Sequence, residues 1–256
     1  MCTTRRESYQ ALVTSLARQT EDNYELLTIP ERGPLAALRN QGLRAAHAPV
    51  VCFIDDDTIC PPTWLSGVLD AFRRPAVVGV SGPAIITDYW RRNRHLFRYP
   101  ALLDLYGRLF LDGNCVPGHL CRSGAPTTVS ADTTCTYEGP VDFLEACNMA
   151  YKTDALKGIG GFDEAYRALG EWSEPDCAYR LRAAAPGTYC YFTPAARLFH
   201  QPARGVATLR RRHTTTRYRN YSLFAARWVK PCWRHTAYRA FLRTYFAAVE
   251  GGLVSP

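Results

Sequence analysis

The chain has 256 residues, of which 47% are hydrophobic, and its formal net charge is +8. This length can bury one substantial core, so we expect one α/β domain with an appendage rather than two equal domains. No apolar run reaches the roughly 18 residues that a membrane-spanning helix needs, and the N-terminal residues lack the apolar segment of a secretory signal. We therefore expect a cytoplasmic protein with anionic molecules among its partners.

The first part of the chain alternates predicted helices and strands. Hydrophobic periodicity predicts helices over residues 5–19, 35–46 and 61–72, and strands over residues 24–29, 50–54 and 76–80. This order of strands and helices predicts a parallel sheet with crossover helices.

The pattern loosens over residues 88–140, where an aromatic and basic stretch at 89–95 precedes a segment rich in Gly, Pro, Ser and Thr. We interpret these residues as an insertion on the acceptor side of a site, because long loops in compact domains are usually functional. Regular structure resumes with predicted strands over 144–151, 188–192 and 196–199 and predicted helices over 153–159 and 175–184.

Residues 206–256 form a basic amphipathic tail, predicted to be helical with a break at Pro231. Such helices can pack on their own domain, lie on the inner face of an anionic membrane, or line a phosphate-bearing site. The composition leaves these alternatives open.

The ten cysteines contain no C-x-x-C pair and no zinc-like spacing with the histidines, so we expect reduced thiols with structural roles.

An apolar run at residues 50–54 ends abruptly in Asp55, Asp56 and Asp57. This pattern predicts a buried strand that delivers carboxylates to the edge of an open α/β sheet, where such sheets bind their ligands. Adjacent carboxylates repel one another unless a cation holds them, and oxygen ligands suit Mg²⁺ or Mn²⁺. The alternative is a solvated turn that caps the next helix.

Further clusters follow in the second half of the chain. Residues 148–164 contain N-M-A-Y-K followed by G-G-F-D-E, residues 174–180 read E-P-D-C-A-Y-R, and residues 198–202 read L-F-H-Q-P. With the acid-tipped strand, this order resembles the family 2 inverting glycosyltransferases of the GT-A fold, and in particular bacterial rhamnosyltransferase-like members. The resemblance covers most of residues 3–200.

The resemblance implies a Rossmann-like, mostly parallel sheet with flanking helices and a GT-A domain over residues 1–205. It also implies transfer of a sugar from a nucleotide-diphosphate sugar to a hydroxyl acceptor, which can be a glycan, a lipid-linked precursor or a small molecule. The implied cofactor is Mg²⁺ or Mn²⁺, held by Asp55, Asp57 and His200.

The remaining site residues also follow from the resemblance. Glu174 takes the place of the catalytic base, with Asp176 as the second choice. The implied acceptor-side residues are Trp172 and Arg180, although packing and salt bridging are alternatives for them. The residues assigned to donor and nucleotide binding are Thr3, Arg5, Glu31, Arg39, Asp55, Asp56 and Asn148.

The sequence departs from the family's pattern at two places. The chain begins at the turn that follows the family's first strand, so that strand is expected to be missing unless the true start lies upstream or another segment fills its place. The loop at residues 30–34 replaces two acids that hold the nucleotide base in relatives, and Glu31 is the candidate substitute.

These departures keep other functions open. One alternative is a non-catalytic relative that binds nucleotide sugars, or a truncated gene product. Another is a metal-dependent nucleotidyltransferase, although the sequence lacks the Gly-rich phosphate loop that this activity needs. Nucleic acid is not expected as a partner, because only the net charge favours it.

Overall fold

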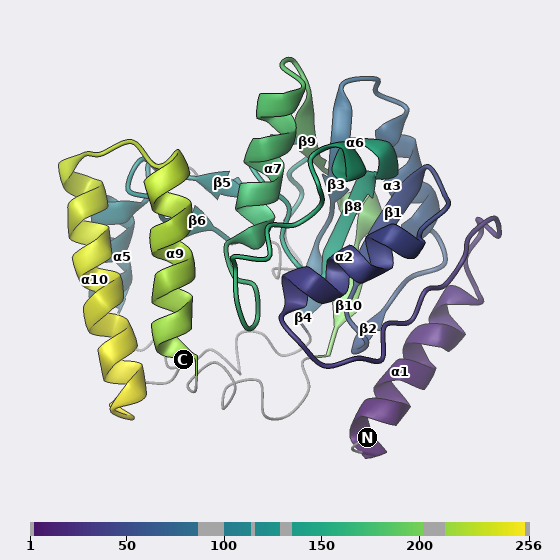
Figure 1. Cartoon of the computed structure of the whole chain (residues 1–256), viewed down its shortest axis with the longest axis horizontal. Coiled ribbons are helices and arrows are strands. Elements are labelled where there is room, and N and C mark those ends of the chain that lie inside the picture. Colours follow the sequence, from purple (N-terminus) through teal and green to yellow (C-terminus); the bar gives the residue numbers. More distant parts are fainter. Residues whose placement is uncertain (1–2, 87–99, 114–115, 129–134, 202–212, 254–256) are drawn as a thin grey trace.

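A mixed five-stranded sheet forms the centre of the protein in a computed structural model that describes residues 3–86, 100–113, 116–128, 135–201 and 213–253 (Figure 1). For residues 3–5 only the backbone is described, and the aromatic and basic stretch at 89–95 lies outside the described residues. The strand order is β1 (Val50–Ile54), β8 (Asn148–Lys152), β3 (Val77–Ser81), β9 (Tyr189–Phe192) and β7 (Gly139–Val141).

The strand directions differ from the expected mostly parallel sheet. β3 pairs in parallel with β9, but β8 is antiparallel to both β1 and β3, and β7 is antiparallel to β9. The α/β class and the flanking helices are as expected. The sheet is mixed because β7 and β8 enter from the segment before them without a crossover helix, and antiparallel pairing does not need one.

In the part of the chain that the structure describes, the acid-bearing strand β1 lies at one edge of the sheet. Among the described residues, β8 is the single strand that pairs with β1. The prediction of a strand over residues 24–29 is wrong, because no neighbouring strand offers this segment a ladder of hydrogen bonds. Its side chains Tyr24, Leu26 and Leu27 are instead 38–42% exposed. Within the described residues, no segment fills the place beside β1 that the family's first strand would take.

Helices cover both faces of the sheet, and strand alternation divides the core between them. In β8, Ala150 faces the cluster formed with α1 (Thr3–Leu16) and α3 (Trp64–Phe72). Its neighbours Met149 and Tyr151 face the cluster formed with α2 (Leu35–Ala45), α6 (Thr153–Gly158) and α7 (Ser173–Ala184). Alternate residues of a strand point to opposite faces, so β8 contributes to both core clusters. The predicted helices in these regions are present.

Shorter strands complete the part of the chain that carries the site. A three-stranded sheet has the order β2 (Thr58–Ile59), β10 (Leu198–His200) and β4 (Ala84–Ile86). A hairpin joins β5 (His119–Leu120) to β6 (Pro126–Thr127), and a 3₁₀ turn, η2 (Pro194–Ala196), precedes β10. The first of these sheets extends directly from the acid turn that follows β1.

Three helices form a separate layer beside the sheet: α5 (Pro100–Phe110), α9 (Thr214–Trp228) and α10 (Trp233–Glu250) (Figure 1). Their shared core contains Phe110, Tyr221, Tyr238 and Phe246. α9 also contacts α7, so the described part of the tail packs on its own domain. No helix in the described ranges is both long enough and apolar enough to cross a membrane.

Candidate functional site

The acid turn after β1 lies against the end of β10. β2 begins directly after Asp57 and pairs antiparallel with β10, with Thr58 opposite His200. This pairing brings His200 Nε2 to 3.2 Å from Asp57 Oδ1, and Asp57 is only 8% exposed. Thr58 Oγ1 donates a hydrogen bond of 2.8 Å to the carbonyl oxygen of Asp55, which stabilises the turn. The structure thus brings together Asp57 and His200, two of the three side chains that the resemblance implies as metal ligands.

Burial and charge both act on the carboxyl group of Asp55. Burial raises the pKa of Asp55, Arg39 and His200 act to lower it, and the nearby Asp57 and Asp56 raise it further. A divalent cation would offset this accumulation of negative charge. The carboxylates of Asp55 and Asp57 and the imidazole of His200 are suitable ligands for such an ion, so the donor set fits a divalent metal.

Cys147 belongs to the same cluster, although its sequence context predicted only a structural thiol. One oxygen of Asp55, the Sγ atom of Cys147 and a ring nitrogen of His200 all lie within 4.8 Å of one another. Burial, reinforced by the charge of Asp55, raises the pKa of the Cys147 thiol well above its ordinary value. Sequence spacing alone could not reveal this neighbour, because the contact depends on the pairing of β8 with β1.

Arg39 connects the acid turn to the predicted catalytic base. Its Nη1 atom donates to Glu174 Oε1 at 2.7 Å and to Ser173 Oγ at 3.3 Å, both in the first turn of α7. Arg39 is 7% exposed and Glu174 is 8% exposed, so their ion pair is buried. Burial opposes the charge of Arg39, but the carboxylates of Glu174 and Asp55 outweigh this effect and raise the pKa of Arg39. Arg39 therefore fixes the position of Glu174 relative to the acids.

Asp176, the second choice for the base, is a buried structural anchor. Its side chain is fully buried and accepts hydrogen bonds from Arg180 Nε at 2.8 Å and Trp228 Nε1 at 2.8 Å. Tyr166 Oη and Arg227 Nη1 each donate to it as well, both at 3.1 Å. A carboxylate that accepts four hydrogen bonds within the fold is poorly placed to accept a proton from a substrate. The geometry favours Glu174 over Asp176.

Asn148, predicted to bind the donor, is instead fully used by the fold. Its Oδ1 accepts a hydrogen bond from Trp64 Nε1 at 3.0 Å. Its Nδ2 donates to the carbonyl oxygens of Gly82 at 2.9 Å and Ala196 at 2.7 Å. The side chain is 2% exposed, so donor contact is not supported for it. These bonds join β8, α3 and the turns that precede β4 and β10.

Trp172 and Arg180, predicted on the acceptor side, also have internal partners. The Trp172 ring packs against Tyr221 and Phe224 of α9, with ring centroids 4.9 and 5.2 Å away. Besides Asp176, Arg180 donates to the carbonyl oxygens of Ile159 and Gly161, which ties α7 to the loop after α6. The packing and salt-bridge alternatives describe these two residues better than acceptor contact does.

The other residues that were predicted to bind the sugar donor are not all close to the acid turn. Thr3 and Arg5 are in the first turn of α1, where the structure describes the backbone alone. Glu31 is exposed in the segment before α2, and Gln41 Nε2 donates to its Oε1 at 3.0 Å. Asp56 is half-buried in the acid turn itself. The structure thus groups Arg39 and the three aspartates but not Glu31.

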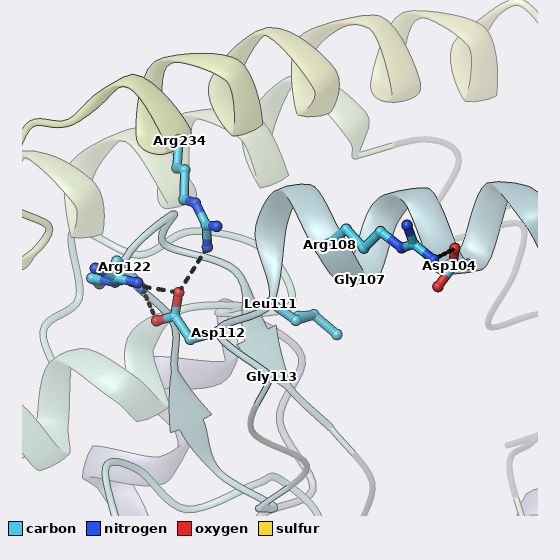
Figure 2. Close-up of a pocket in the computed structure, with 8 residues that line it drawn as sticks. All are labelled: Asp104, Gly107, Arg108, Leu111, Asp112, Gly113, Arg122 and Arg234. Atoms are coloured by element: carbon cyan, nitrogen blue, oxygen red, sulfur yellow. Dashed lines mark hydrogen bonds and ion pairs between the residues drawn. The ribbon is translucent and has the colours of Figure 1, made fainter.

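A second charged cluster lies between α5, α10 and the β5–β6 hairpin (Figure 2). It lines a cavity of about 450 Å³ that shares no residue with the acid turn. Asp112 accepts hydrogen bonds from the backbone N–H of Arg122 at 2.7 Å and from Arg234 Nη1 at 3.2 Å. This cluster could not be predicted from sequence motifs, because it combines residues of the insertion with residues of the distant tail.

Comparison with known proteins gives one match by sequence. The family model described as glycosyl transferase family 2 matches residues 6–125, which include most of α1, the acid turn and β3. No curated protein matches the sequence.

Similar solved structures are those of GalNAc-T7 with UDP, GalNAc and Mn²⁺, the mannosyltransferase PcManGT from Pyrobaculum calidifontis with GDP-Man and Mn²⁺, and TarS from S. aureus. Each gives a TM-score of 0.53, at 13%, 15% and 12% sequence identity respectively. The matches cover 86%, 96% and 96% of this chain. The chain spans 38%, 68% and 41% of the length of those proteins. At this identity the likeness shows a shared fold.

Proposed function

We propose that this chain, which shares the fold of GT-A glycosyltransferases and matches the family 2 model over residues 6–125, transfers a sugar from a nucleotide-diphosphate sugar to a hydroxyl acceptor with inversion at the anomeric carbon. The observation that carries this proposal is the 3.2 Å approach of Asp57 Oδ1 to His200 Nε2 at the end of the acid-bearing strand. The buried ion pair between Arg39 of α2 and Glu174 of α7 also supports the proposal.

Asp55, Asp57 and His200 hold the cofactor in this proposal. The structures of GalNAc-T7 and PcManGT contain Mn²⁺ together with UDP or GDP-Man, which supports a divalent cation here. When bound, the cation supplies Lewis-acid stabilisation of the negative charge that develops on the leaving diphosphate. By holding this cation, the two carboxylates and the imidazole would set where the phosphates of the donor bind, and so would orient the donor.

Glu174 is the proposed general base. Direct displacement at the anomeric carbon needs a group that takes the proton of the acceptor hydroxyl. Arg39 holds Oε1 of this carboxylate at 2.7 Å, and Oε2 is the proposed proton acceptor. The position of Glu174 in the first turn of α7 also places its charge where a helix dipole stabilises anions.

The proposed catalytic unit spans residues 1–205, with residues 88–140 on the acceptor side and residues 206–256 as a helical cover. The contacts of α9 with α7 support a tail that stabilises the helix bearing Glu174. The exposed residues Trp233, Arg239 and Arg243 of α10 support peripheral contact with an anionic membrane surface. This contact favours a lipid-linked acceptor over a free glycan or a small molecule.

Donor turnover tests the proposal. Release of the nucleotide diphosphate would be measured with Mn²⁺ and a panel of glycan, lipid-linked and small-molecule hydroxyl acceptors, and NMR would give the anomeric configuration of the product. We expect Asp57→Asn and Glu174→Gln to lower the turnover rate at least about 100-fold, because each removes a group that acts on the reacting atoms.

Asp70→Asn is the matched control, because Asp70 is an exposed carboxylate paired only at the surface with Arg73. It should leave turnover unchanged. Retention of configuration, or equal rates for all three variants and the unmodified protein, would contradict the proposal. Nucleotide binding without turnover in the unmodified protein would instead support a non-catalytic relative.

A further inference from the structure

Cys147 lies beside the acid turn, in the turn that leads into β8. β1 and β8 pair antiparallel from Val50 opposite Lys152 to Ile54 opposite Asn148. The ladder ends there, and Asp55 and Cys147 lie just beyond its end, Asp55 after β1 and Cys147 before β8. Cys147 is 3% exposed, so its thiol is buried beside the acid turn rather than displayed on the surface.

The distances in this cluster suit a single ion. Ligand atoms around a tetrahedral metal lie about 3.3–3.8 Å apart when metal–ligand distances are about 2.0–2.3 Å. His200 Nε2 and Asp57 Oδ1 are already 3.2 Å apart. The thiol sulfur, an Asp55 oxygen and a His200 nitrogen lie within 4.8 Å of one another, so only small side-chain rotations would be needed for one ion to contact these three atoms.

We infer that Cys147 is a metal ligand in this site and that its sulfur makes the site prefer Mn²⁺ to Mg²⁺. This inference rests on the proposed metal-assisted function and specifies its cofactor. Mg²⁺ strongly prefers oxygen ligands and retains water, whereas sulfur and imidazole ligands favour transition metals. On binding, the thiol releases its proton to solvent and coordinates as the thiolate.

A second set of residues on the chain provides an internal comparison. Asp112, His119 and Cys121 also have ligand atoms within 4.8 Å of one another. Asp112, however, is paired with two arginines, Arg122 and Arg234, as Figure 2 shows. His119 Nδ1 lies 2.8 Å from the Asp142 carboxylate. The positive charges of Arg122 and Arg234 repel a cation, so this cluster should bind a metal ion more weakly than the acid turn does.

Titration of the metal-free full-length protein with Co²⁺ alone tests the inference directly. Thiolate ligation gives a sulfur-to-cobalt charge-transfer band in the near ultraviolet, whereas oxygen and nitrogen ligands give only weak visible bands. We expect a saturable charge-transfer band in the unmodified protein and in Cys121→Ser, but not in Cys147→Ser. Competition against Co²⁺ should also show that Cys147→Ser lowers the ratio of Mn²⁺ to Mg²⁺ affinity by about tenfold or more.

The outcomes separate this inference from the proposed function. Saturable Co²⁺ binding that Asp57→Asn abolishes, without a charge-transfer band, would overturn the role of Cys147 and leave the metal site intact. A band that survives in Cys147→Ser and disappears in Cys121→Ser would assign the metal to the second cluster and also overturn the inference. Absence of Co²⁺ binding would contradict both proposals. If Cys147→Ser does not fold, as judged by circular dichroism, the spectrum of the unmodified protein still decides whether sulfur binds.

Discussion

Arg39 carries a buried positive charge that acts on two carboxylates of the proposed site, those of Glu174 and Asp55. Its guanidinium group donates to Glu174 at 2.7 Å, and its charge also acts on Asp55. A buried ion pair adds little net stability compared with well-packed apolar residues, but loss of one partner leaves an uncompensated charge inside the protein. The pair therefore fixes geometry more than it adds to the free energy of unfolding.

This view predicts the effect of removing Arg39. We expect Arg39→Met to lower the free energy of unfolding by about 3–5 kcal/mol, because Glu174 is left as a buried unpaired carboxylate. The double variant Arg39→Met/Glu174→Met should recover part of this loss. Chemical denaturation measures both values. Equal stability of Arg39→Met and the unmodified protein would show that the pair is solvated rather than buried.

At the residue scale the sequence predicted the acid turn and His200 as neighbours, but it could not assign every motif residue. Asn148 and Arg180 match the family pattern, yet both side chains donate hydrogen bonds to backbone carbonyl oxygens within the fold. A motif gives the position of a residue but not the partners of its side chain. For the same reason Cys147 was missed, since it comes near Asp55 only where the turn before β8 meets the end of β1.

One buried carboxylate anchors the contact between α7 and α9, beside the packing of Tyr179 on Phe224 and Trp228. Asp176 in α7 accepts hydrogen bonds from both Arg227 and Trp228 of α9, and its side chain is fully buried. The helical tail is thereby tied to the helix that carries Glu174. We infer that the tail stabilises the position of the proposed base rather than acting as an independent unit.

Asp176→Ala tests this connection. It should lower the free energy of unfolding by about 3–5 kcal/mol, because Arg180 and Arg227 lose a buried counter-charge. Asp154→Ala, which removes an exposed carboxylate from the first turn of α6, is the control and should change stability by less than about 1 kcal/mol. Similar losses in the two variants, measured by denaturant unfolding, would argue against the anchor.

A second contact of α9 should make stability depend on pH. Burial alone would raise the pKa of Asp163, but the backbone N–H of Ala165 and the ion pair with Arg227 lower it below its ordinary value. A carboxyl group with a lowered pKa in the folded state stabilises the protein above its unfolded-state pKa of about 3.9 and loses this effect as the pH falls through the folded-state value.

Asp163→Asn should therefore reduce the free energy of unfolding by about 1 kcal/mol at pH 7, because it removes the 2.6 Å ion pair with Arg227. The difference between variant and unmodified protein should shrink as the pH falls below about 4. Denaturation midpoints over the range from pH 3 to pH 7 measure this difference. A gap that stays constant over this range would show that the charge of Asp163 is not the cause.

On the scale of the whole molecule, periodicity predicted the helices and most of the core strands, because each buries one face against the sheet. It failed for residues 24–29 and for strand direction, since both depend on which segment pairs with which. The position of β1 at the edge of the described sheet could not be predicted either, because it too depends on which segments pair. The segment at 24–29 has apolar residues suited to a strand, yet it forms none where no neighbouring strand pairs with it.

The central claim is that this fold binds a nucleotide-diphosphate sugar through a metal at the acid turn. Thermal unfolding with UDP-, GDP- and dTDP-sugars, each with and without Mn²⁺, tests it most directly, because a ligand that binds only the folded state raises its apparent stability. We predict that one nucleotide class raises the unfolding temperature only with Mn²⁺, and that Asp57→Asn abolishes this shift. Absence of any shift in the folded, unmodified protein, or an equal shift in Asp57→Asn, would contradict the account.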